Sequence, residues 1–112
     1  MHAPAMNPSF IIDLVFDTDC PHVGEARLLL RRALSDAGLP LAWREWDRNA
    51  ADTPVALRDL GSPTILVNGT DASGEDPVAN AAEAASACRI YRHDDGLHGV
   101  PALAAVMRAL AR

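Results

Sequence analysis

Short apolar runs of strand length alternate along the chain with a longer stretch that has the spacing of a helix. The run Phe10–Phe16 is rich in β-branched and aromatic residues, which is typical of a buried strand, and Leu41–Trp46 reads as a half-buried one. Between them, apolar residues from Val23 to Ala37 recur at steps of three and four and form one face of a helix. Gly38 and Pro40 follow, as helix ends commonly read.

The middle of the chain predicts a short helix and a third strand. Asp52 or Thr53 can cap a short helix that has Pro54 in its first turn and runs to Leu60. Pro63 then opens a strand rich in β-branched residues, which ends at the tight turn Asn68-Gly69.

The region after this turn is polar and acidic, so we expect the partner strand to be delayed by an insertion. The insertion covers Thr70–Asp76 and an alanine-rich stretch, Pro77–Ala87, which predicts a short helix. The alternation of Cys88–Arg92 predicts the delayed, half-buried strand. After a turn at His93–Gly96, Val100–Leu110 predicts a last amphipathic helix.

The expected order is β-α-β-α-β-β-α, an α/β fold with a mixed four-stranded sheet and an insertion before the last strand. Because the first three strands alternate with helices, we expect them to pair in parallel. The last two strands are expected to be antiparallel neighbours. Residues 1–9 read as a flexible lead-in and residues 10–112 as one domain, which the length of 112 residues fits.

Charge and composition exclude several classes of partner. The formal net charge of −5 argues against nucleic acids and anionic membranes, because phosphate binding requires a basic face. No run reaches the roughly 18 apolar residues of a membrane span. Met1–Ser9 does not have the composition of a signal peptide. We therefore expect a reducing cytoplasm, where the two cysteines would be thiols or form a transient disulfide.

Two short motifs carry a resemblance to the thioredoxin-like superfamily. Cys20-Pro21 follows the first strand, and Gly61-Ser62-Pro63-Thr64 leads into the third. A later Cys-Arg-x-Tyr stretch, Cys88–Tyr91, narrows the likeness to small members often labelled alkylmercury lyase-like. The resemblance implies a thioredoxin-like fold, with the cysteine at the head of the first helix.

The resemblance also implies roles for the residues around this cysteine. Pro63 would follow a cis peptide bond, face Cys20 and hold substrate backbone against it. The neighbouring candidates for substrate contact are Pro21, His22, Ser62 and Thr64. The chain departs from the thioredoxin pattern Cys-x-x-Cys in having Val23 at the fourth position.

The first motif therefore offers one thiol, and its reactivity is open from the sequence. A helix N-terminus favours the thiolate of Cys20, and a protonated His22 would assist. The carboxylates of Asp17 and Asp19 oppose it, so the direction of the pKa shift stays undecided. Cys88 is either a core residue of its strand or the resolving thiol for Cys20, which would require Cα atoms within roughly 7 Å.

Three functions follow from these residues. The first is a thiol-disulfide redox protein without a cofactor, in which Cys20 attacks a protein or small-molecule disulfide and Cys88 or an external thiol resolves the product. The second is a module that binds mercury or copper through both thiolates. The third is an interaction domain without redox activity. His22, His93 and His98 could add metal ligands, but Cys20-x-His22 is too short for the usual zinc spacing, so no metal site is assigned.

Overall fold

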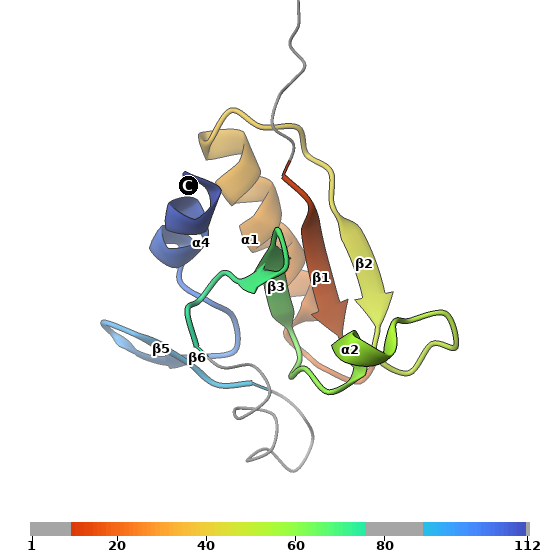
Figure 1. Cartoon of the computed structure of the whole chain (residues 1–112). Coiled ribbons are helices and arrows are strands. Elements are labelled where there is room, and N and C mark those ends of the chain that lie inside the picture. The colour runs from red at the N-terminus through yellow and green to blue at the C-terminus, as the bar shows by residue number, and fades with distance from the viewer. Residues whose placement is uncertain (1–9, 76–88, 112) are drawn as a thin grey trace, which may run out of the picture.

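The computed structural model describes residues 10–75 and 89–111, and its centre is a mixed four-stranded sheet (Figure 1). The strand order is β2-β1-β3-β4. β1 pairs in parallel with β2 and antiparallel with β3, and β3 pairs antiparallel with β4. The strands are β1 (Ile12–Phe16), β2 (Arg44–Asp47), β3 (Thr64–Val67) and β4 (Thr70–Asp71).

In the part of the chain that the structure describes, three helices and a separate hairpin accompany this sheet. The helices are α1 (Val23–Asp36), α2 (Val55–Arg58) and α4 (Leu103–Leu110). The hairpin joins β5 (Tyr91–His93) to β6 (Gly96–His98) in a two-stranded sheet of its own. In the described ranges, no helix combines the length and the apolar character that crossing a bilayer requires.

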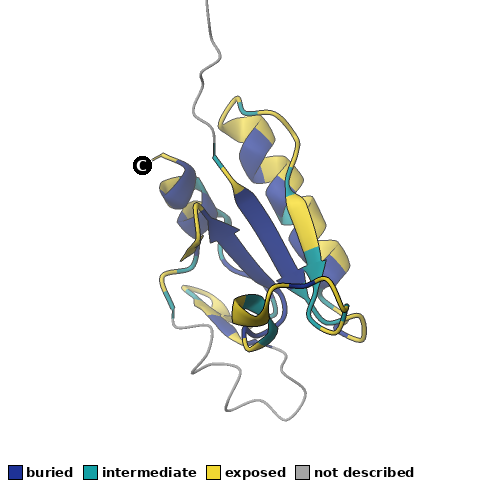
Figure 2. Cartoon of the chain, turned by 45° about the vertical axis from the view of Figure 1, so that its right-hand side comes forward, coloured by how far each residue is buried: buried dark blue, intermediate teal, exposed yellow. Residues whose placement is uncertain are grey.

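The side chains of β1 and β3 alternate between two apolar clusters, as the pleat of a strand requires. Leu14 and Ile65 belong to the larger cluster, which α1 and α4 complete on one face of the sheet. Val15 and Leu66 point to the other face, where they pack with Leu60 in a smaller cluster near α2. Figure 2 shows the consequence: the central strands are buried, whereas β2 lies at an exposed edge.

The direction of the third strand corrects one expectation. β1 and β2 are parallel as predicted, but β3 runs antiparallel to β1. To place β3 parallel to β1, the connection before β3 would have to carry the chain back along the length of the sheet. Such a crossover usually contains a helix of several turns. The four residues of α2 span only about 6 Å at 1.5 Å per residue, so this connection does not carry the chain back.

The expected delay before the fourth strand is also wrong. Asn68 and Gly69 adopt positive φ angles of 53° and 84°, and β4 follows them at once. Its polarity is no obstacle, because an edge strand faces solvent. The later strand, predicted at 88–92, begins at Tyr91 and pairs with β6 rather than with the main sheet. The expected helix 77–87, Cys88 and the lead-in 1–9 lie outside the described residues.

Candidate site at Cys20 and the Ser62-Pro63 loop

Cys20 lies in the turn between β1 and α1, next to the segment that leads into β3. Its backbone N–H donates to the Asp17 carbonyl at 2.9 Å. Its side chain is only 7% exposed, and Sγ lies 3.7 Å from the Ser62 carbonyl oxygen, to which it donates. α1 begins three residues later, at Val23, with His22 as its N-cap residue. The thiol thus sits just before the helix and against the segment named by the second motif.

That segment, Gly61–Thr64, is called the prolyl loop below. The Ser62-Pro63 peptide bond is cis, which confirms the expectation from the resemblance. Ser62 is fully buried, and its hydroxyl accepts the Asp17 N–H at 2.8 Å. Together with the Cys20 contact, this bond ties the turn after β1 to the prolyl loop.

The chain at the start of the hairpin also donates hydrogen bonds to the prolyl loop. The Arg89 N–H donates to the Ser62 carbonyl at 2.8 Å, so this oxygen accepts from both Arg89 and Cys20. The Tyr91 hydroxyl donates to the Pro63 carbonyl. Burial raises the pKa of Tyr91 well above its ordinary value, so the phenol stays neutral and remains a donor.

A buried ion pair between Arg89 and Asp71 lies against the same prolyl loop. The Arg89 side chain is fully buried, and its guanidinium donates to the Asp71 carboxylate at 2.5 Å and to the Thr64 hydroxyl at 3.1 Å. It also lies over the ring of Tyr91, 4.3 Å from the centroid. Thr64 in turn donates to the Gly61 carbonyl at 2.6 Å. One guanidinium therefore links β4, the start of β3 and the chain before β5.

The candidate substrate-contact residues are thus divided by their exposure. Ser62, Pro63 and Thr64 are fully buried, and the two hydroxyls are used in internal hydrogen bonds. Pro21 is exposed and His22 is half-buried. The accessible surface next to Cys20 is therefore built from the turn before α1 rather than from the prolyl loop.

The structure describes three histidines, and it does not bring all three to the thiol. His22 Nδ1 lies 3.5 Å from the Glu25 carboxylate, and its ring lies directly against Gly99. His93 and His98 come together on the hairpin instead, with Asp95. Among the described residues, this group includes neither His22 nor Cys20. The partner proposed for Cys20, Cys88, lies outside the described residues.

Sequence reasoning missed Arg89 as a residue of this site. In the sequence, the Cys-Arg-x-Tyr stretch supports only the resemblance. In the structure, its Arg and Tyr both donate hydrogen bonds to the prolyl loop. An arginine within an alternating apolar stretch is the available signal, because a buried arginine requires a partner.

Comparisons of this chain with protein-family models, with curated proteins and with solved structures found no match.

Proposed function

We propose that this protein is a thioredoxin-like thiol redox protein that reacts through Cys20. The observation that carries the proposal is the contact of the Cys20 sulfur with the Ser62 carbonyl, beside Pro63 and just before α1. The sheet order β2-β1-β3-β4, with α1 and α4 on one face, is compatible with a thioredoxin-like fold.

The start of α1 provides a source of thiolate stabilisation. His22, the N-cap residue of this 14-residue helix, makes no side-chain capping hydrogen bond, and the first backbone N–H groups of a helix have no partner within the helix itself. Such groups and the helix dipole favour a negative charge nearby. Asp17 opposes the thiolate less than its charge suggests, because Arg48 lies 3.4 Å from its carboxylate.

The proposed reaction is one thiol-disulfide exchange. The Cys20 thiol loses its proton to solvent, and the thiolate attacks one sulfur of a protein or small-molecule disulfide. A bond forms between the two sulfurs, the original S–S bond breaks, and the second sulfur leaves as a thiolate. A further thiol, from Cys88 or from the medium, then attacks the mixed disulfide and releases Cys20. No cofactor takes part.

One observation favours a second candidate, an interaction domain without redox activity. The Cys20 side chain is 7% exposed, and its S–H donates to a carbonyl, an interaction that the thiolate would lose. A thiol held in this way behaves as a small buried hydrophobe.

The pH dependence of the rate at which Cys20 is alkylated distinguishes the redox protein from the interaction domain. The reduced chain carrying Cys88→Ser is treated with iodoacetamide from pH 5 to 10, and Cys20→Ser is the matched control. The redox proposal expects a half-maximal rate below about pH 8.5, the ordinary thiol value, and a mixed disulfide at Cys20 after incubation with glutathione disulfide. A rate that rises only above that pH, with no mixed disulfide in the mass spectrum, selects the interaction domain.

Comparing the chain with and without Cys88 identifies the resolving thiol. If Cys88 resolves, the chain with both cysteines accumulates an internal disulfide, and the Cys88→Ser variant stops at the mixed disulfide with glutathione. If an external thiol resolves, both proteins stop at the mixed disulfide until glutathione is added.

A further inference from the structure

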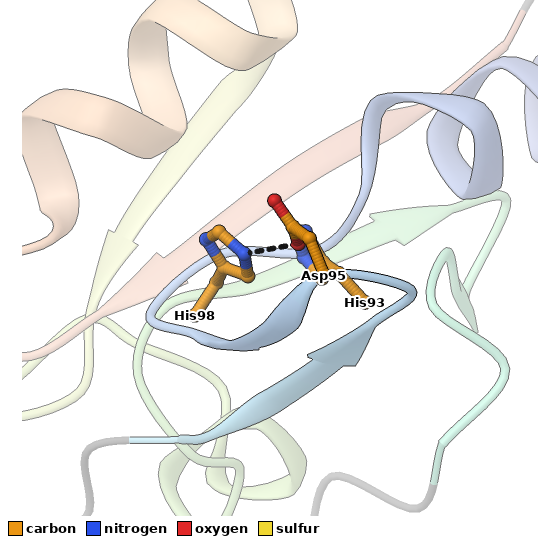
Figure 3. A group of neighbouring side chains, drawn as sticks. All are labelled: His93, Asp95 and His98. Carbon is orange, nitrogen blue, oxygen red and sulfur yellow. Dashed lines mark hydrogen bonds and ion pairs between the residues drawn. The ribbon is translucent and has the colours of Figure 1, made fainter.

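The β5–β6 hairpin gathers three metal-ligating side chains that the redox proposal does not use. His93, Asp95 and His98 each offer one donor atom, and these atoms lie within 4.8 Å of one another. Figure 3 shows His98 directed at the Asp95 carboxylate, with His93 beside the same carboxylate. The two imidazole rings stack with their centroids 3.9 Å apart and an interplanar angle of 18°.

The register of the hairpin explains why the two histidines meet. His98 lies opposite Tyr91, and His93 follows Tyr91 by two residues on the same strand. Residues two apart share a face of a strand, and diagonal partners are within reach of long side chains. The turn between the strands then brings Asp95 to the same end.

A backbone contact fixes which nitrogen of His93 is available. His93 Nε2 lies 2.8 Å from the Val100 carbonyl oxygen. A carbonyl only accepts hydrogen bonds, so Nε2 carries the proton and the lone pair of the neutral ring is on Nδ1. Metal-binding histidines are commonly oriented in this way, by donating their other N–H to a backbone carbonyl.

The second histidine, His98, already contacts the carboxylate of the group. His98 Nε2 lies 2.8 Å from Asp95 Oδ1, with a proton between them. A metal ion can replace that proton. Tetrahedral zinc, with bonds of about 2.0–2.1 Å, separates two ligand atoms by roughly 3.4 Å, so the pair needs to open by about 0.6 Å. Asp95 is exposed and lies in a turn, where such a movement is easy.

We propose that His93 Nδ1, Asp95 Oδ1 and His98 Nε2 form a binding site for a divalent transition-metal ion of the zinc type. Two imidazoles and one carboxylate suit zinc rather than magnesium or calcium, which prefer oxygen ligands alone. Three protein ligands leave a fourth position for water or a bound anion. The site uses neither Cys20 nor the prolyl loop, so it does not depend on the redox proposal.

Calorimetric titration of the full, untagged, reduced chain with Zn²⁺ tests this proposal. We expect one ion per chain with micromolar or tighter affinity, and a loss of about tenfold or more in His98→Gln and in His93→Gln. Asp94→Asn, a change of the neighbouring exposed carboxylate, and His22→Gln, a change of a histidine outside the group, are the matched controls and should bind like the parent.

Two further readouts keep the result decisive. If His93→Gln loses its fold together with the Val100 contact, His98→Gln with an unchanged circular dichroism spectrum carries the test. Titration with Co²⁺ should give a spectrum without a thiolate-to-metal charge-transfer band. Undetectable zinc binding, binding that His98→Gln leaves intact, or a thiolate band with cobalt would each overturn the proposal.

Discussion

Tyr91 holds the main chain at Pro63 through a hydrogen bond from its phenol to the Pro63 carbonyl oxygen. The tyrosine is 1% exposed and is the only one in the chain. It comes from the hairpin, and Pro63 comes from the loop that touches the candidate thiol. The side chain therefore couples the C-terminal part of the fold to the site at Cys20.

This contact predicts a loss of stability in alkali. The pKa of Tyr91 is raised in the folded chain, whereas the unfolded chain releases the proton near pH 10. Below that pH the stabilising effect is fully present. Above it, the unfolded state binds fewer protons than the folded state, so the free energy of unfolding falls as the pH rises. Urea unfolding at pH 7 to 11.5 measures this slope.

Tyr91→Phe is the matched control for the alkaline effect. The variant should lose about 1–3 kcal/mol at pH 7, because the Pro63 carbonyl loses its donor, but its stability should fall less steeply above pH 10. The chain has no lysine, so few other groups titrate in this range. Tyrosinate absorbance at pH 10.5 in a chain that is still folded would contradict the prediction.

The ion pair between Arg89 and Asp71 is predicted to matter most when only one partner is removed. Asp71→Asn leaves the buried guanidinium without its counter-charge, and we expect a loss of about 3–5 kcal/mol in the free energy of unfolding. Arg89→Met removes the charge but also the bond to Thr64, and should be comparably unstable.

The double variant Arg89→Met with Asp71→Asn tests whether the pair acts as a unit. We expect it to be less destabilised than the sum of the two single changes, by about 0.5–3 kcal/mol, because neither partner is left buried and uncompensated. Denaturant unfolding followed by circular dichroism measures all four proteins. Simple additivity would show that the two side chains act independently.

Local features of this fold were predictable from the sequence, and long-range features were not. The periodicity and the Gly38 stop predicted α1 almost to its ends. The direction of β3 was missed because it depends on where the chain crosses the sheet after α2, which no local spacing specifies. β4 was missed because two polar residues can pair at a sheet edge without a hydrophobic pattern.

The candidate site shows the same division. The placement of Cys20 beside the prolyl loop came from the resemblance, since their contact spans 42 residues. The grouping of His93 with His98 depends on the register of the β5–β6 hairpin. The sequence predicted a strand that ends at Arg92 and did not predict β6 as its partner, so this register could not be foreseen. The role of Arg89 required its burial, because the same residue in an exposed strand would simply be solvated.

Gly99 is predicted to tolerate no side chain while His22 is present. A Cβ at position 99 would lie 2.3 Å from Cγ of the His22 ring, which is closer than van der Waals contact allows. Gly99→Ala should therefore lower the free energy of unfolding by about 1–3 kcal/mol. His22→Ala should recover much of this loss in the double variant. Thermal unfolding of the four proteins measures the recovery, and its absence would place the strain elsewhere.

Gly24 should instead be a position where alanine stabilises the fold. It is the second residue of α1, and a Cβ added there meets nothing within 4 Å. Alanine restricts the unfolded chain and suits a helix better, so we expect a gain of about 0.4–1 kcal/mol in the free energy of unfolding.

Gly38→Ala is the matched control, because its surroundings are equally open but its φ is +71°. That variant should lose stability, since a side chain is strained in the left-handed region. Thermal or denaturant unfolding measures both, and stabilisation by both alanines would show that backbone conformation does not decide the sign.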